Sequence, residues 1–410
     1  MESLLIRFLG LMCVALLVVI GARRLRLPLA VALLVAGTLL GLAGWRTGFV
    51  LDSDLIYNGV LPLLLFEAAF DIRWHELRRD LVPVLVLATV GVLVSAAVVS
   101  AGMMFLLGWP RLPALLFGAL IAATDPVAVI AMFKDAGMQG RFRLLVESES
   151  LLNDGVGAVL FALVVAAASN GGAMGALPAA LTLALNVGGA TLTGLICGIA
   201  VVAAAEQTAD RLVKTALSVV AAYGSFQVAE HLHASGVLAT VITGLIAANL
   251  GTAARSGAND GLASDHGYIA EFWDLAAFVA NAALFLLIGL EMPAIDFGAL
   301  GAVGIGAAVA LVLAGRAAAV YPIGLAAHAT RWRIPAVDLH VLWWGGLRGV
   351  LGIALALSLP PGTNHRPQII IATFAVVAFS VLVQGGTMPW VLRRAARAHA
   401  AHIESDERPR

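Results

Sequence analysis

Two acidic motifs lie inside long apolar stretches of this 410-residue chain. Residues 123–128 read Ala-Thr-Asp-Pro-Val-Ala, and residues 149–155 read Glu-Ser-Leu-Leu-Asn-Asp-Gly. A charged side chain at the centre of a bilayer costs about 2.5–3.5 kcal/mol, so such residues usually pair with one another or line a path for ions. The proline and small polar residues beside them are typical of an interrupted helix that coordinates an ion. The motifs therefore indicate a transporter of a small cation.

The second motif places four polar side chains on adjacent faces of one helix. Residues four apart stack on the same face, so Ser150 lies beside Asp154 and Glu149 beside Asn153. Hard cations prefer several oxygen ligands, which carboxylates, hydroxyls and backbone carbonyls supply. Where the proline of the first motif interrupts its helix, carbonyls such as that of Thr124 lose their helical partners. The expected ligands of the cation are Asp154, Ser150 and Thr124.

A carboxylate that binds a cation can also bind a proton, and it cannot hold both at once. This competition is sufficient for exchange if Asp154 releases a proton and takes up a cation on one side, then reverses the trade on the other. A gated cation channel built from the same helices is an alternative that would conduct without proton coupling. A membrane-embedded enzyme is disfavoured, because the spans carry no paired nucleophile and base and no metal cluster. We expect no cofactor and no nucleic-acid partner.

The composition predicts an all-α polytopic membrane protein in contact with the lipid bilayer. The chain is 61% hydrophobic and 12% charged, with a mean hydropathy of +0.96, against about 25% charged residues in soluble domains. No Walker-type glycine loop is present, so a gradient would drive transport. Thirteen apolar stretches are long enough to cross the roughly 30 Å hydrocarbon core: 3–21, 27–44, 54–70, 82–107, 112–133, 146–168, 177–204, 213–230, 236–250, 271–290, 299–326, 337–358 and 369–391. The pair 213–230 and 236–250 could instead form one re-entrant hairpin.

The distribution of basic residues predicts the orientation. Most of the 25 Lys and Arg residues fall in alternate loops and the C-terminal tail, whereas the other loops hold only Arg46, Arg111 and Arg366. Cytoplasmic loops carry the excess of positive charge. We expect a multi-pass protein of the plasma (inner) membrane, with the N-terminus outside, the C-terminus in the cytoplasm and an odd number of spans.

Interrupted helices occur in both halves of the chain. Asp125 lies in the first interruption, and residues 343–349, Trp-Trp-Gly-Gly-Leu-Arg-Gly, form the second, which contains Arg348. Paired interruptions predict two inverted six-helix repeats, with the seventh span as linker and the ion site at mid-membrane. The opposite charges would each neutralise a half-helix dipole where the broken helices cross. A tight helix contact at the glycines is the alternative.

The sequence resembles the monovalent cation:proton antiporters of the NhaP and sodium/proton exchanger type. The resemblance rests on the two acidic motifs about 25 residues apart. Weaker matches extend it over nearly the whole chain: Leu-Leu-Phe-Glu at 64–67, Phe-Leu-Leu-Ile-Gly-Leu-Glu at 285–291, Gly315-Arg316, and Gly-Leu-Arg-Gly at 346–349.

The resemblance implies roles for individual residues. Asp154 would bind the ion and the proton, with Asn153 beside it, and the Asn-Asp pair is associated with electroneutral one-for-one exchange. The positions expected in or around the ion site are Thr124, Asp125, Ser150 and Glu67. Glu149 would form a structural ion pair with Arg316, and Arg348 would be the charge at the helix crossing. Sodium, or lithium, is the first choice of cation and potassium the second.

The resemblance also implies a homodimer with two bundles in each chain. Residues 1–392 would form the transporter domain, with a mobile core bundle over about 82–168 and 299–392 and a dimerisation bundle over about 1–80 and 177–290. Residues 393–410 would form a short cytoplasmic tail.

Overall fold

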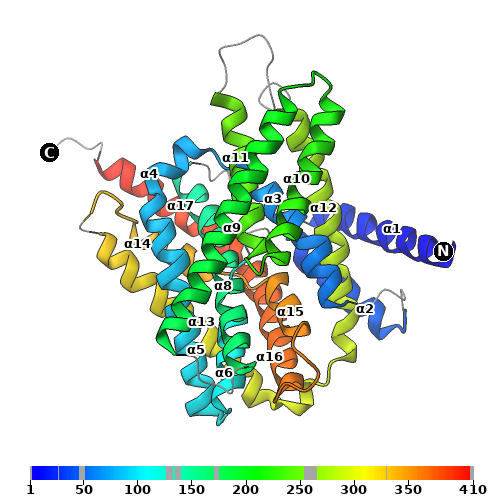
Figure 1. Cartoon of the computed structure of the whole chain (residues 1–410). Helices are drawn as coiled ribbons and strands as arrows, with labels where there is room; N and C mark the ends of the chain where they lie inside the picture. The colour runs from blue at the N-terminus through cyan, green and yellow to red at the C-terminus, as the bar shows by residue number, and fades with distance from the viewer. Residues whose placement is uncertain are drawn as a thin grey trace.

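The structure is entirely helical in the parts of the chain that it describes (Figure 1). The computed structural model describes residues 2–25, 27–45, 51–125, 133, 140–169, 175–253, 266–328 and 330–406. The first seven predicted stretches overlap α1 (Glu2–Leu25), α2 (Leu29–Leu42), η1 with α3 (Leu55–Val60 and Leu61–Asp71), α4 with η2 and α5 (Trp74–Val86, Leu87–Gly91 and Val92–Leu107), α6 (Arg111–Ala122), α8 (Arg141–Ser169) and α9 (Ala176–Ala205).

The other six stretches overlap the helices of the second half. These are α10 (Arg211–His231), α11 (Gly236–Ala253), α12 (His266–Glu291), α13 (Gly301–Ala327), α14 with α15 (Ala336–Trp344 and Val350–Leu357), and α16 with η5 and α17 (Arg366–Phe379, Ser380–Gly385 and Gly386–Asp406). Two single 3-10 turns, η3 (Met292–Ala294) and η4 (Phe297–Ala299), join α12 to α13. The last helix continues through much of the segment expected to be a tail.

Local sequence explains several helix ends. Pro28, Pro110 and Pro335 each directly precede a helix, where a fixed φ favours helix entry and the missing N–H removes no intrahelical bond. The Asp210 carboxylate caps α10 by accepting a hydrogen bond from the Leu212 N–H at 2.8 Å. Gly108 ends α5 with φ +66°, a left-handed conformation that costs glycine little.

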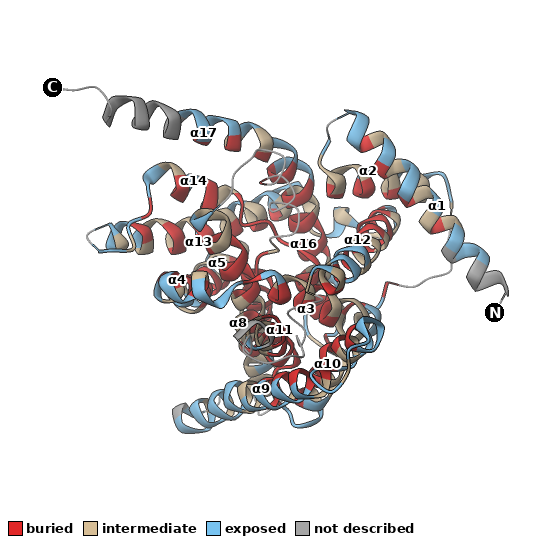
Figure 2. Ribbon diagram, turned by 90° about the horizontal axis from the view of Figure 1, so that it is seen from above, coloured by how far each residue is buried: buried red, intermediate tan, exposed pale blue. Residues whose placement is uncertain are grey.

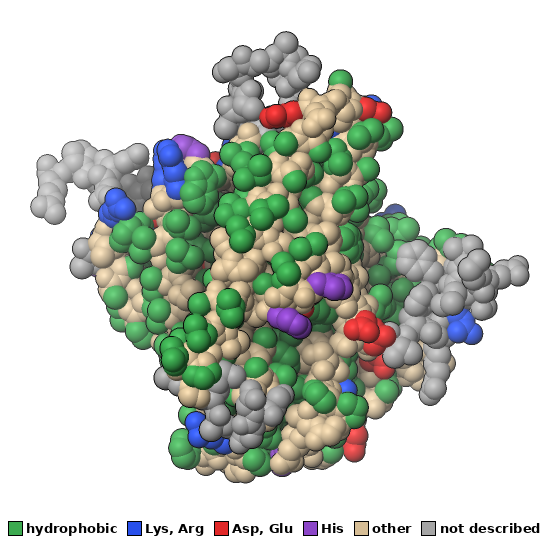
Figure 3. All heavy atoms as spheres, viewed as in Figure 1, with side chains coloured by type: hydrophobic (Ala, Val, Ile, Leu, Met, Phe, Trp, Pro, Cys, Tyr) green, Lys and Arg blue, Asp and Glu red, His purple; other side chains and the backbone are tan. Residues whose placement is uncertain are grey.

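Helix length and composition establish a multi-pass membrane protein. Within the described residues, seven helical segments are long and apolar enough to cross a bilayer: 74–107, 141–168, 177–205, 211–231, 266–294, 301–327 and 366–397. Three shorter apolar helices, 29–42, 111–122 and 236–250, accompany them. Leu177, Leu185 and Leu192 of α9 are exposed, and much of α9 is coloured as exposed in Figure 2. Hydrophobic side chains likewise cover much of the face seen in Figure 3, as lipid contact requires.

Helix pairs pack closely through small residues. Gly37 of α2 and Gly289 of α12 face each other, and a Cβ on Gly37 would lie 3.0 Å from the Gly289 Cα. Such contacts are typical of membrane helices, where close backbone approach replaces the hydrophobic driving force. Other pairs in contact are α3 with α11, α9 with α11, α5 with α6 and α13, and α6 with α8. The helix with the second acidic motif, α8, also contacts α3, α4, α9, α11 and α15.

Candidate ion-binding site

Two interrupted helices meet at the centre of the candidate site. The α6 helix ends at Ala122 and continues as extended backbone, while α14 and α15 are separated by residues 345–349. The two breaks touch directly, because the Asp125 N–H donates to the Leu347 carbonyl at 2.8 Å. The predicted interruption after position 125 involves Pro126, which lies outside the described residues.

A buried arginine neutralises the end of one half-helix. The Nη1 of Arg348 donates to the carbonyls of Ala122 and Ala123, at 2.6 and 2.9 Å, and the residue is 2% exposed. These carbonyls lie at the C-terminal end of α6, which carries partial negative charge and has no further helical N–H to bind. Arg348 thus lies where the two breaks meet, bonded to backbone oxygens.

The side chain of Asp125 lies against the start of the other half-helix. Gly349 is the residue preceding α15, and a Cβ at this position would overlap the Asp125 side chain. Only a glycine lets the carboxylate approach the backbone so closely here. A carboxylate at a helix N-terminus is stabilised by the positive end of the dipole.

One face of α8 carries a buried ion pair. Arg316 of α13 binds Glu149 with two hydrogen bonds, Nη1 to Oε1 at 2.7 Å and Nη2 to Oε2 at 3.0 Å. Glu149 is fully buried and Arg316 is 6% exposed. The arginine also donates to the Leu342 carbonyl of α14, at 3.3 Å, and a Cβ on Gly346 would lie 2.7 Å from its Nε. The pair therefore ties α8 to α13 and to the second interruption.

Asn153 and Ser150 hold Thr124 in place. The Asn153 side chain accepts a hydrogen bond from the Thr124 N–H at 3.0 Å and donates to its Oγ1 at 2.7 Å. It also donates to Glu149 at 3.1 Å, and the Ser150 hydroxyl lies 3.2 Å from that of Thr124. This buried network fixes the first interruption relative to α8, since each amide and hydroxyl is matched to a partner.

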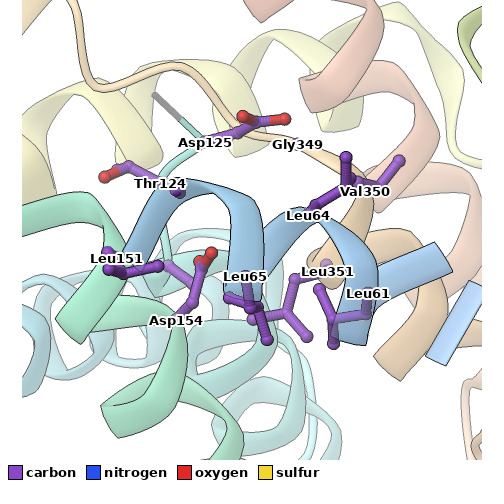
Figure 4. Close-up of a pocket in the computed structure, with 13 residues that line it drawn as sticks. Leu61, Leu64, Leu65, Thr124, Asp125, Leu151, Asp154, Gly349, Val350 and Leu351 are labelled. Carbon is purple, nitrogen blue, oxygen red and sulfur yellow. The ribbon is translucent and has the colours of Figure 1, made fainter. Parts of the chain in front are cut away.

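Asp154 points into a small cavity at the crossing (Figure 4). The cavity has a volume of about 40 Å³, enough for a water molecule or an alkali cation. Thr124, Asp125 and Asp154 are the polar residues that line it, and the other lining residues are Leu61, Leu64, Leu65, Ala68, Ala123, Leu151, Gly349, Val350, Leu351 and Gly352. Within the described part of the chain, no hydrogen bond reaches the Asp154 carboxylate, so its oxygens are available to a cation or a proton.

The predicted residues fall into three groups. Asp154, Thr124 and Asp125 line the cavity, while Ser150 and Asn153 support it from α8. Glu67 is not brought to this cavity, although its neighbours on α3 are. It lies instead with Asp71 and Asp274, whose carboxylate oxygens come within 4.8 Å of one another and of its own.

Sequence reasoning missed the leucines of α3 and the support beneath the second break. The Gln384 Nε2 donates to the carbonyl of Trp344, the last residue of α14, at 2.9 Å. The Ser380 Oγ donates in turn to the Gln384 Oε1 at 2.8 Å. Ser380 and Gln384 are polar residues one helical turn apart in the thirteenth apolar stretch, and this pattern could have indicated the support.

Comparisons with known proteins agree with this geometry. The family described as "Sodium/hydrogen exchanger, transmembrane" matches residues 11–394. This chain belongs to the sodium/hydrogen exchanger family. It is 38% identical over 377 residues to the Na(+)/H(+) antiporter ApNhaP of Aphanothece halophytica, covering 90% of this chain and 70% of that protein. It is 33% identical to the Na(+)/H(+) antiporter NhaP of Pseudomonas aeruginosa, covering 83% and 81%.

A solved structure has the same fold. The sodium proton antiporter MjNhaP1 from Methanocaldococcus jannaschii superposes with a TM-score of 0.76 at 21% identity, covering 96% of this chain and 99% of that one. The predicted resemblance is therefore confirmed, and with it an all-helical membrane transporter in place of an enzyme.

Proposed function

We propose that this exchanger-family chain carries sodium (or lithium) across the membrane in exchange for protons. The observation that carries the proposal is the Asp154 carboxylate, which faces a cavity of ionic size at the meeting point of two interrupted helices. Relatives named as Na(+)/H(+) antiporters share 33–38% identity over most of the chain, which supports sodium as the cation.

Competition for one carboxylate gives the coupling. A lone negative charge on Asp154 is disfavoured in the apolar interior of a membrane protein. Asp154 therefore passes between a protonated state and a cation-bound state, and the empty, charged state is the costly one. Thr124 and Ser150 supply further oxygens, and one proton is exchanged for one cation.

The proposal extends to the membrane topology and to the division of the chain into two bundles. The chain crosses the membrane thirteen times as two inverted repeats, with the N-terminus outside and the C-terminus in the cytoplasm. A core bundle over about 82–168 and 299–392 moves against a scaffold over about 1–80 and 177–290, and the scaffold pairs with a second copy. Contacts among α5, α6, α8 and α13, and among α2, α3, α9, α11 and α12, support this division.

The deciding experiment uses purified protein in liposomes with an imposed pH gradient and an internal pH dye. Sodium, lithium and potassium are added in turn, with and without a potassium-valinomycin clamp. We expect sodium-driven proton movement that the clamp leaves unchanged and that Asp154→Asn abolishes, because an amide cannot titrate.

Other outcomes discriminate between the alternatives. A response to potassium alone would identify a K⁺/H⁺ antiporter. Tracer cation flux without proton movement, retained in Asp154→Asn, would contradict exchange and identify a cation channel.

A further inference from the structure

A large groove separates the half-helix α14 from the last helix α17. Its volume is about 590 Å³, within the usual range of about 300–1,000 Å³ for ligand pockets. Apolar and aromatic side chains form most of its walls, including Trp343, Trp344 and Trp390. It shares no lining residue with the Asp154 cavity. Both helices lie at the edge of the molecule, where lipid can reach them (Figure 2).

The groove is apolar at one end and basic at the other. The first half of α17, from Thr387 to Ala395, lines it together with α14, and the end of α14 meets the start of α17, so the two helices run antiparallel along it. The Trp344 Nε1 donates to the Thr387 Oγ1 at 2.9 Å at the apolar end. His340 and Arg394 line the opposite end, and both are exposed. The Arg394 guanidinium stands 5.6 Å from the centre of the Trp390 ring.

Further positive charge surrounds the basic end. Arg393 and Arg397 are exposed on α17 beside Arg394, and Arg331 and Arg333 are exposed in the segment that leads into α14. The nearby acidic residue of α14, Asp338, is 6% exposed. On α17, Glu404 and Asp406 follow about two turns beyond Arg397. The mouth is therefore complementary to an anion.

We propose that this groove holds one anionic phospholipid. An acyl chain occupies the aromatic cleft, and the phosphate binds Arg394 and His340 at the mouth. The basic end of the groove would hold the headgroup at the membrane surface, and the apolar end would hold the acyl chain toward the midplane, as in a lipid of one leaflet. Arginine suits the phosphate because its planar fork donates two parallel hydrogen bonds, and basic sites between helices commonly bind anionic headgroups.

A lipid bound in the groove would affect the ion site by restraining α14. Trp344, which lines the groove, is the last residue before the second interruption, and its carbonyl is held by Gln384. A lipid packed against Trp343 and Trp344 therefore restrains the half-helix that leads to Arg348. The lipid site itself does not depend on which cation is exchanged.

The test titrates the full chain in detergent with dioleoyl phosphatidylglycerol, dioleoyl phosphatidylcholine or inorganic phosphate, and follows thermal unfolding and native mass. We expect phosphatidylglycerol to raise the unfolding midpoint and to remain bound as one molecule per chain. Arg394→Gln should raise the Kd for phosphatidylglycerol about fivefold, because one arginine near an anionic headgroup contributes about that factor to the affinity. Val391→Trp, which fills the groove without changing charge, should also weaken it.

The matched control is Arg393→Gln, because this neighbouring arginine is exposed on the same helix but does not line the groove. It adds only to the surrounding positive charge, so its loss should weaken binding less than the loss of Arg394 does. Equal effects of phosphatidylglycerol and phosphatidylcholine would overturn the proposal, as would equal losses in the two arginine variants. Stabilisation by inorganic phosphate alone would overturn it too, since the acyl chain would then contribute nothing.

Discussion

At the scale of single residues, neighbouring positions on α8 do different work. Glu149 and Asn153 are saturated with partners, whereas the Asp154 carboxylate faces the cavity. A saturated group is held in place and a group facing a cavity can exchange its ligand. The proposed division of one helical turn into supporting and ion-binding side chains follows from which of them find partners on neighbouring helices.

The proposed competition at Asp154 predicts how the transport rate depends on pH. Because a proton and a cation share one carboxylate, lowering the pH should raise the apparent KM for sodium while leaving the maximal rate at saturating sodium nearly unchanged. The rise should approach, and not exceed, about tenfold per pH unit, by mass action. Initial rates in liposomes over a matrix of pH and sodium concentration measure this; a KM independent of pH would argue against a shared site.

The buried pair of Glu149 and Arg316 predicts a stability effect. Glu149→Gln should leave the guanidinium without its counter-charge and destabilise the protein by about 3–5 kcal/mol. The matched control is Glu76→Gln, which removes an exposed ion pair with Arg73 at 3.7 Å and should change stability by at most about 1 kcal/mol. Thermal unfolding in detergent compares the two. Equal midpoints would mean that the buried pair contributes no stability.

At the scale of helices, the crossing depends on interruptions that leave backbone groups to be satisfied from elsewhere. Arg348 binds the free carbonyls of α6, and Gln384 and Arg316 bind carbonyls of α14. The ends of α6 and α14 are thus bound by side chains from other segments of the chain. In a membrane interior an unsatisfied carbonyl is costly, so these side chains are what permits the break.

The close approach at Gly349 predicts that a single methyl group disrupts the crossing. Gly349→Ala should reduce transport at least tenfold, because its Cβ would overlap the Asp125 side chain and force the breaks apart. Gly362→Ala is the matched control, since no atom lies within 4 Å of its Cβ position. Sodium-driven proton flux in liposomes measures both. Full activity of Gly349→Ala would show that the spacing between the breaks is not critical.

At the scale of the whole molecule, the proposed movement of core against scaffold must pass along α8 and α11. Gly155 of α8 faces Leu238 of α11, and a Cβ on this glycine would lie 2.7 Å from the Leu238 Cγ. The contact lies directly beside Asp154, at the boundary between the two proposed bundles. Any displacement of the ion site across the membrane changes it.

A cross-link at this boundary tests the movement. Gly155→Cys with Leu238→Cys, in a background without Cys13 and Cys197, should form a disulfide because the side chains are adjacent. Oxidation should stop transport and reduction should restore it. The single Leu238→Cys variant controls for oxidation damage. Undiminished transport by the oxidised, fully cross-linked protein would show that α8 and α11 stay fixed relative to one another.

Much of the fold could be predicted from local properties of the chain. Apolar stretches long enough for a bilayer gave the approximate position of most helices, and the glycines at 345, 346 and 349 marked where α14 and α15 are separated. Glu67 illustrates the limit. The resemblance to the antiporters placed it in or around the ion site, but α3 presents Leu64, Leu65 and Ala68 to the cavity, and Glu67 lies with Asp71 and Asp274.

The sequence by itself determined that the chain lies in a bilayer, where its helices form and which charged groups they carry. Hydropathy, the positions of proline and glycine, and charges in apolar segments are local properties that can be read without the fold. Only the tertiary structure decided which of these groups remain without a partner. The two breaks are more than 200 residues apart, yet the Asp125 N–H bonds the Leu347 carbonyl and Arg348 binds the end of α6. Distant segments set these contacts through packing, and packing leaves Asp154 facing the cavity while Glu149 is bound.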